Sequence, residues 1–149
     1  MHELTLCGHE VVAEGTWMFC FGRPPGFQFK AGQAISLELL EPPAEPNSAR
    51  RTFSLASAPA EDMLVVATRM REGSAYKRAL KALPEGAKLK LRGPLGTMTL
   101  HEDASRAAVF VAGGIGITPF FSMLRQAAHE KSSRAFLLIY SNRRPEDAP

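Results

Sequence analysis

A glycine-rich segment, Gly113-Gly114-Ile115-Gly116-Ile117-Thr118-Pro119, has the composition of a phosphate-binding turn. Residues 109–112 before it form an apolar run with the length of a buried parallel strand, and residues 120–129 after it have helical periodicity. Pro119 suits the first helical turn, where a missing N–H costs nothing. Glycines let the backbone approach an anion, and the free N–H groups of a helix start point at it. A plain strand-to-helix corner would show the same pattern, so this segment alone leaves nucleotide binding open.

A second candidate set is Arg51, Thr52, Phe53 and Ser54. The guanidinium of Arg51 is a permanent cation whose planar fork suits a diphosphate. In a strand, Phe53 projects on the same side and offers a flat apolar face, with the Ser54 hydroxyl beside it. Together they would serve a ligand that has both phosphates and a ring. An ordinary strand, with Phe53 in the core and Arg51 in water, would look alike, because aromatic residues are common in strands.

The segment Gly73-Ser74-Ala75 is a second possible anion site, because Ser74 is a good N-cap for a short amphipathic helix. Such a helix start places free N–H groups next to Lys77 and Arg78, one turn further on. The periodicity predicts that Lys77, Arg78 and Lys81 point away from the apolar face. A plain N-cap is the simpler reading, but two phosphate-competent helix starts in one small protein are harder to dismiss than one.

The rest of the chain supplies the elements that position these residues. Alternation predicts six short strands and one helix before residue 103, which together suggest a closed or nearly closed antiparallel barrel. From residue 107 onward the pattern is strand, helix and strand, a βαβ unit with parallel strands. The domain boundary is predicted near Asp103. The predicted barrel strands are residues 3–12, 16–21, 34–40, part of 50–59, 63–69 and 88–92.

Composition excludes several classes of function. The chain has 149 residues with 45% hydrophobic and 22% charged residues, as in ordinary soluble proteins, and no apolar run approaches the roughly 20 residues of a membrane span. Its start lacks a secretory signal, so we expect a cytoplasmic protein. A net charge of +3 fits anionic ligands or an acidic partner but is too small to argue for nucleic acid. Cys7 and Cys20 are predicted to be buried free thiols, and no pair of the four histidines has metal-ligand spacing.

In chain order, these motifs resemble those of the ferredoxin–NADP reductase superfamily of flavin oxidoreductases. Any one motif is modest, but several in family order are specific, and the resemblance runs over almost the whole chain. Residues 51–54 resemble the flavin signature Arg-x-Tyr-Ser. The glycine-rich segment resembles the nicotinamide-domain motif. The matching segments are Arg51-Thr52-Phe53-Ser54, Gly73-Ser74-Ala75, Gly93-Pro94-Leu95-Gly96, residues 113–119 and Tyr140-Ser141-Asn142-Arg143.

For the flavin, the resemblance implies that Arg51 pairs with the diphosphate and that Phe53 lies against the isoalloxazine ring. Ser54 would hydrogen-bond near the reactive N5, and Gly73-Ser74-Ala75 would hold phosphate through backbone N–H groups. The two phosphate sites favour FAD over FMN as the cofactor. The remaining flavin contacts would come from Thr52, Thr68, Arg69 and Met70.

For the nicotinamide cofactor, the resemblance implies that the glycine-rich segment receives NAD(P)H and that Arg143 meets its ribose or phosphate. The catalytic residues implied are Ser54 and Thr118. Hydride would pass from nicotinamide C4 to flavin N5, and electrons would leave singly to an acceptor protein such as an iron–sulfur protein. The residues of the glycine-rich segment assigned to NAD(P)H are Gly113, Gly114, Gly116, Thr118 and Pro119.

The fold implied is a six-stranded antiparallel Greek-key β-barrel with one helix, residues 1–103, followed by an incomplete parallel βαβ nucleotide-binding domain, residues 104–149. Two features depart from the family. Phe53 stands where tyrosine is usual, so a phenol hydrogen bond is lost. The second domain is shorter than the about 50 residues that a domain needs to stand alone, so we expect a C-terminally truncated chain or self-association that completes it. A flavin-binding electron-transfer or regulatory module without competent nicotinamide binding remains the alternative.

Overall fold

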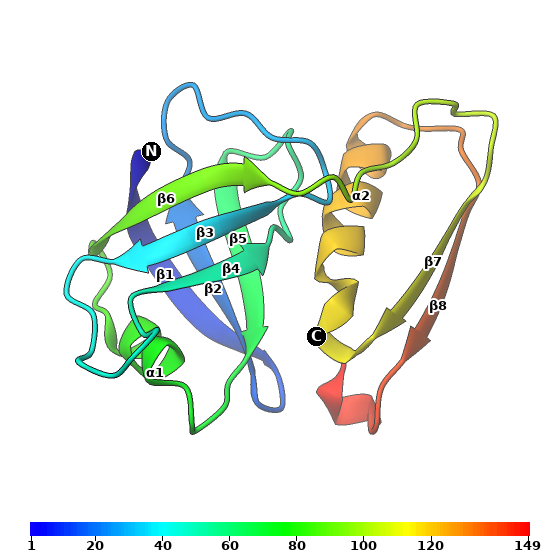
Figure 1. Ribbon diagram of the computed structural model, residues 1–149. Helices are drawn as coiled ribbons and strands as arrows, with labels where there is room; N and C mark the ends of the chain where they lie inside the picture. The colour runs from blue at the N-terminus through cyan, green and yellow to red at the C-terminus, as the bar shows by residue number, and fades with distance from the viewer.

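The computed structural model describes residues 1–149 and contains a six-stranded antiparallel sheet and a separate parallel pair of strands (Figure 1). One short helix, α1 (Ala75–Ala82), lies at one end of the larger sheet. All six predicted barrel strands and the predicted helix are present. The strands of the larger sheet are β1 (His2–Ala13), β2 (Thr16–Gly22), β3 (Ala34–Leu39), β4 (Arg50–Ser54), β5 (Met63–Arg69) and β6 (Lys88–Leu95).

The larger sheet curls into a barrel. Its strand order is β4-β3-β6-β1-β2-β5, and every pair of neighbours is antiparallel. The two outer strands meet where a bridge joins Leu55 to Val66 and the Ala56 N–H donates to the Val65 carbonyl at 2.8 Å. The predicted antiparallel barrel is therefore confirmed, and its last pair of strands is joined over only a short length.

The barrel interior follows from the alternation of the strands. Inward side chains such as Phe19 and Leu91 are fully buried, whereas their sequence neighbours are half-buried or exposed. Tyr76 of α1 closes one end of the core, where its hydroxyl donates to the Leu37 carbonyl at 3.0 Å. Burial raises the pKa of this phenol, because the interior disfavours the charged form.

The prediction that both cysteines are buried is wrong. Cys20 is half-buried and Cys7 is exposed. The register of β1 against β2 shifts between Leu6 and Gly8, as expected for a bulge at Gly8, so Cys7 has no partner in the ladder. The bulge therefore lets the Cys7 side chain face solvent.

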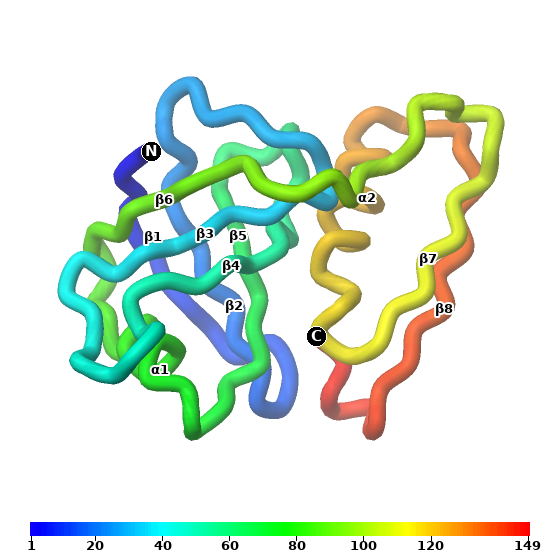
Figure 2. Tube along the Cα trace, viewed as in Figure 1, coloured from blue at the N-terminus to red at the C-terminus, as the bar shows by residue number.

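The second unit is a βαβ arrangement, as predicted. It consists of β7 (Ala108–Gly113), the 3₁₀ turn η1 (Gly114–Ile117), α2 (Thr118–His129), β8 (Phe136–Ser141) and the 3₁₀ turn η2 (Pro145–Asp147). The two strands are parallel. Figure 2 shows α2 running between the barrel and the β7–β8 pair. None of the helices is long and apolar enough to cross a bilayer.

Only one face of the β7–β8 pair is covered. On that face Phe110 stacks on Phe120 of α2 with ring centroids 4.6 Å apart. The opposite face exposes large apolar side chains, including Val111 at 69% and Leu137 at 55%. The βαβ unit therefore buries far less apolar surface than the barrel does.

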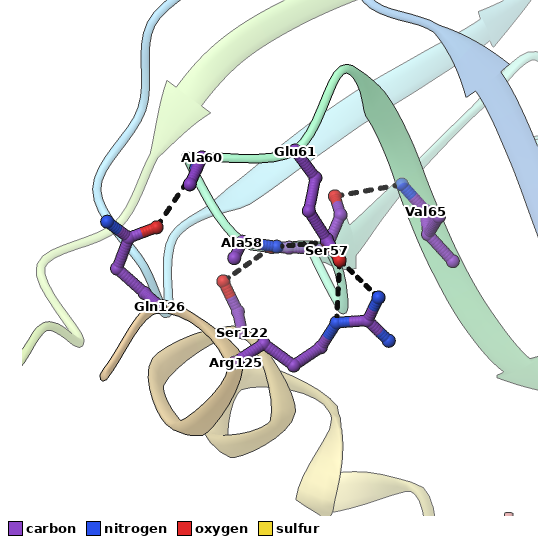
Figure 3. Close-up of polar contacts among 8 residues, drawn as sticks. All are labelled: Ser57, Ala58, Ala60, Glu61, Val65, Ser122, Arg125 and Gln126. Atoms are coloured by element: carbon purple, nitrogen blue, oxygen red, sulfur yellow. Dashed lines mark hydrogen bonds and ion pairs between the residues drawn. The ribbon is translucent and has the colours of Figure 1, made fainter. Parts of the chain in front are cut away.

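Polar contacts fasten α2 to the barrel loop of residues 55–62 (Figure 3). The Ser122 hydroxyl is fully buried and donates to the Ser57 carbonyl at 2.6 Å. The Ala60 N–H donates to the Gln126 side chain at 2.9 Å. Arg125 of the same helix pairs with Glu61. These contacts set where the start of α2 lies against the barrel, and hence where the glycine-rich segment lies.

Candidate functional site

A cleft of about 540 Å³, here called the barrel cleft, lies between the barrel and the glycine-rich segment. Its volume is within the range of about 300–1,000 Å³ that is usual for cofactor sites. It brings together predicted flavin residues of β4 and β5 with predicted nicotinamide residues of η1 and α2. The lining residues are Arg51, Thr52, Phe53, Ser54, Ala67, Thr68, Lys77, Met98, Ile115, Gly116, Thr118 and Pro119.

Arg51 is a cation without an acidic partner. Its guanidinium lies over the Tyr76 ring, 5.8 Å from the centroid, and donates to the backbone carbonyls of Arg50, at 3.0 Å, and Asn47. No carboxylate pairs with it. Because carbonyls only partly balance a guanidinium, this arrangement leaves Arg51 able to bind an anion.

Lys77 is a second cation of the barrel cleft, and it lies outside the buried apolar face of α1, as predicted. Ser74 caps α1 and accepts from the Lys77 N–H at 3.4 Å, which puts Lys77 in the first turn. From there its ammonium reaches back and donates to the Arg69 carbonyl at 2.6 Å. Burial, and then the positive charges of Arg71 and Arg51, lower the pKa of Lys77. A half-buried cation among other cations favours an anionic ligand, and its position three residues after the N-cap was the available sequence signal.

Phe53 belongs to the barrel core and to the cleft wall at once. Its side chain is only 7% exposed and lies 6.0 Å from the Tyr76 ring, centroid to centroid. The remaining exposed part lines the barrel cleft beside half-buried Ser54. Phe53 therefore lies in the core, as in an ordinary strand, and also reaches the wall of the cleft, and its contact with a flavin ring stays a prediction.

The segment Gly73-Ser74-Ala75 does not line the barrel cleft. Ser74 acts as the N-cap of α1, and its N–H donates to the Arg71 carbonyl at 3.0 Å. Ala75 is buried and Gly73 is exposed. The structure therefore shows the N-cap reading, and the phosphate role of this segment stays a prediction.

A second cavity of about 600 Å³, here called the interdomain cavity, lies where the end of β5 faces the carboxyl ends of β7 and β8. Arg69 and Met70 line this cavity, whereas Thr68 lines the barrel cleft, so the predicted run of three flavin residues is divided. Thr68 and Arg69 are successive residues of β5 and point to opposite faces of the strand, whereas Met70 follows its end. The lining residues are Arg69, Met70, Arg71, Gly113, Gly114, Ser141, Asn142 and Arg143.

The glycine-rich segment separates the two cavities. Gly113 and Gly114 face the interdomain cavity, and Gly116, Thr118 and Pro119 face the barrel cleft. Gly114 has φ +52°, a left-handed conformation that favours glycine. The Thr118 hydroxyl donates to the Ile115 carbonyl at 2.7 Å and so fixes the turn. A catalytic role for Thr118 stays a prediction.

Ion pairs at the end of the chain border the interdomain cavity. The Asp147 carboxylate is buried and accepts from Arg144 at 3.2 Å and from Arg69 at 3.0 Å. Arg144, and to a smaller degree Arg69, hold the pKa of Asp147 below its usual range. Arg144 also pairs with Glu14 of the β1–β2 turn at 3.2 Å. These contacts tie η2 to the barrel and balance the charge of Arg69.

Sequence reasoning missed several lining residues. Arg71 follows the end of β5, where no periodicity predicts the direction of a side chain. Ser141 and Asn142 belong to the Tyr140–Arg143 segment, in which the family resemblance implicates only Arg143. The other missed residues are Ala67, Lys77, Met98 and Ile115.

Comparison with known proteins gives concordant matches. The protein-family profile described as oxidoreductase NAD-binding domain matches residues 110–148. The chain is 34% identical over 122 residues to ferredoxin–NADP reductase B of Sorangium cellulosum, which covers 81% of this chain and 49% of that protein. It is 31% identical over 143 residues to the glycine betaine monooxygenase reductase subunit of Pseudomonas aeruginosa, covering 91% of this chain and 38% of that protein.

Solved structures agree with these sequence matches. Phthalate dioxygenase reductase, described as a modular structure for electron transfer from pyridine nucleotides to [2Fe–2S], superposes with a TM-score of 0.81 at 30% identity. The match covers 99% of this chain and 45% of that one. The cytochrome P450 reductase of Amycolatopsis gives a TM-score of 0.83 at 28% identity, covering 98% and 45%. The chain thus spans about half or less of the length of these relatives.

Proposed function

Since this chain belongs to the ferredoxin–NADP reductase superfamily, we propose that it serves flavin-dependent electron transfer from NAD(P)H, through FAD, to a one-electron acceptor protein. Its relatives include a ferredoxin reductase and two oxygenase reductases, which supports an iron–sulfur or similar acceptor. The acceptor itself is part of the proposal.

The observation that carries this proposal is the composition of the barrel cleft. Its barrel wall provides two cations without acidic partners, Arg51 and Lys77, together with an aromatic edge and hydroxyl groups. Its opposite wall is the glycine-rich turn at the start of α2. A flavin with a phosphorylated tail needs the first set, and a nicotinamide donor needs backbone that permits close approach.

The donor set of the barrel cleft fits FAD. Arg51 and Lys77 would bind the diphosphate, and their two charges favour the two phosphates of FAD over the single phosphate of FMN. Bound FAD would supply the chemistry of accepting electrons in pairs and releasing them singly. Ser54 would hold the flavin edge by a hydrogen bond, and Phe53 would pack against the ring.

The apolar part of the same wall would limit access of water. Met98, Ile115 and Pro119 line the barrel cleft next to Phe53. Gly116 has no side chain to hold the nicotinamide away from the flavin. Orientation and exclusion of water are what a protein contributes when a cofactor carries the reaction.

The proposal is tested by loading the purified chain with FAD and adding NADH or NADPH without oxygen. Loss of the flavin absorbance band at about 450 nm is expected. A chain that binds FAD but keeps this band with both nucleotides would instead support the alternative, a flavin-binding electron-transfer or regulatory module. A chain that does not bind FAD at all contradicts the proposal.

A further inference from the structure

The only two cysteines of the chain, Cys7 and Cys20, lie on neighbouring antiparallel strands of the barrel, β1 and β2. Cys20 stands between the fully buried Phe19 and Phe21, so its side chain points to the outer face of the barrel. Cys7 follows the fully buried Leu6 and is itself exposed, so it points to the same face. Both thiols are therefore outside the barrel core.

The bulge in β1 places the two cysteines opposite each other. Gly8 is paired with Cys20, and the next pair along the ladder joins Leu6 to Phe21. Cys7 is the extra residue between these two pairs. At such a bulge two residues of one strand oppose one residue of the other, so Cys7 and Gly8 both oppose Cys20. Because Gly8 has no side chain, Cys7 provides the side chain that faces Cys20 from β1.

The surroundings leave room for the two sulfur atoms to meet. Cys7 Sγ lies 3.9 Å from the position that a Cβ would occupy on Gly22, which is two residues from Cys20 on the same face of β2. No side chain of Gly22 therefore separates the thiols. Opposed residues of antiparallel strands have Cβ atoms about 4.5–5.5 Å apart, and disulfides need about 3.5–4.5 Å, so a small adjustment of the bulge brings the thiols to bonding distance.

We propose that Cys7 and Cys20 form a reversible redox pair, which closes to an intramolecular disulfide across the bulge when a small-molecule disulfide is the oxidant. The exposed Cys7 thiolate attacks one sulfur of the oxidant, whose S–S bond breaks and releases one thiolate. The Cys20 thiolate then attacks the Cys7 sulfur and displaces the second thiolate. In total the two cysteines lose two protons and two electrons, and the oxidant is reduced to two thiols.

The environment of Cys20 suits it to the second step. Burial, and then the negative charge of the Cys7 thiolate, raise the pKa of Cys20, so it is less often a thiolate than an ordinary cysteine. Cys20 also lines a surface cavity of about 260 Å³ together with Glu10 and Glu85. Because these carboxylates disfavour an anionic oxidant, a neutral disulfide is the appropriate probe. The pair needs neither flavin nor nucleotide, so its failure would leave the proposed function untouched.

The test is equilibration of the full chain with mixtures of hydroxyethyl disulfide and mercaptoethanol, followed by acid quenching. Thiol counting and peptide mass mapping then identify the products. We expect both thiols to disappear in one transition, with the peptides that contain Cys7 and Cys20 linked to each other. The equilibrium constant for oxidation should be at least about tenfold larger for the folded chain than for the chain unfolded in urea, because the fold holds the thiols together.

Two variants serve as controls. Cys20→Ser leaves Cys7 without a partner and should give a mixed disulfide with mercaptoethanol in place of the internal link. Cys20→Ser combined with Met18→Cys moves the second thiol by two residues along the same face of β2. In this matched control, the internal link should form no more readily in the folded chain than in the unfolded one.

Several results would overturn the inference. Separate mixed disulfides on the two cysteines, or links between chains instead of within one chain, would each do so. Equal equilibrium constants for the folded and unfolded chains would show that the fold does not bring the thiols together. Linkage of Cys7 to a cysteine at position 18 as readily as to Cys20 would also refute it, because the bulge would then not determine the pair.

Discussion

In the barrel, 17 buried apolar side chains form one cluster, whereas in the βαβ unit only three form a cluster between the sheet and α2. The barrel closes its strands around its own core. The βαβ unit has one covered face and one exposed face, and its position depends on contacts with the barrel. The two walls of the candidate site therefore belong to units that differ in apolar packing. The geometry of the whole site depends on the less well packed βαβ unit.

The largest expected effect is a difference in the free energy of unfolding between two leucine-to-alanine variants, one in each unit. Leu91→Ala removes a fully buried side chain from the barrel core and should lower the free energy of unfolding by about 2–5 kcal/mol. Leu137→Ala, at a position 55% exposed, should change it by roughly 0.5 kcal/mol or less. Urea unfolding of both variants measures the difference. Similar losses would mean that the outer face of β8 is covered in solution, which would remove the contrast.

The two units also contribute different kinds of residue to the barrel cleft. Both of its cations, Arg51 and Lys77, come from the barrel, and the βαβ unit contributes apolar side chains, a glycine and a threonine. Lys77→Gln should therefore weaken FAD binding by about tenfold, as measured by quenching of flavin fluorescence. Lys30→Gln, an exposed lysine outside the cleft, is the control.

The stability of the Lys77 variant separates a binding role from a structural one. The folded protein lowers the pKa of Lys77 below 10.5, so the charged form opposes folding at neutral pH. Removing the charge should leave the free energy of unfolding unchanged or slightly raised. A clear loss of stability with unchanged FAD affinity would assign Lys77 to the fold, not to the ligand.

The hydroxyl of Tyr76 joins α1 to the barrel, and its contribution to the free energy of unfolding can be measured. Tyr76→Phe removes the hydrogen bond to the Leu37 carbonyl and should lower the free energy of unfolding by about 1 kcal/mol at pH 7. The folded state raises the pKa of Tyr76 above its ordinary 10.0, so the neutral phenol supports folding below pH 10 and this support is lost as the pH rises further. The difference between wild type and variant should shrink above pH 10. A constant difference would show that the phenol does not titrate with unfolding.

The sequence predicts the barrel well because alternation is a local property. Each strand needs only its own pattern, and the inward residues of β2, β3 and β6 are buried as expected. Arg51 and Phe53, which the sequence singles out by their chemistry, also line one cleft together. These parts could be read without knowing which strands are neighbours.

What the sequence did not predict depends on contacts between elements. A helical period assigned Lys77 to the polar face, yet its long stem reaches back to the carbonyl of Arg69. Arg71 and Asn142 become cavity residues only because the end of β5 faces the ends of β7 and β8. Such placements follow from how the two units pack, which no periodicity within one segment records.

That packing is tested locally by Ser122→Ala. The variant removes the hydroxyl that donates to the Ser57 carbonyl, which should cost about 1 kcal/mol and loosen α2 from the barrel. Amide hydrogen exchange resolves the effect by residue. The Ala60 N–H, bonded to Gln126 of α2, should exchange faster, while the Ala56 N–H, bonded to Val65 within the barrel, should not change. Ser133→Ala, an exposed serine after α2, is the control. If both amides exchange faster together, the barrel and α2 open as one unit. The βαβ unit would then not be less stable than the barrel.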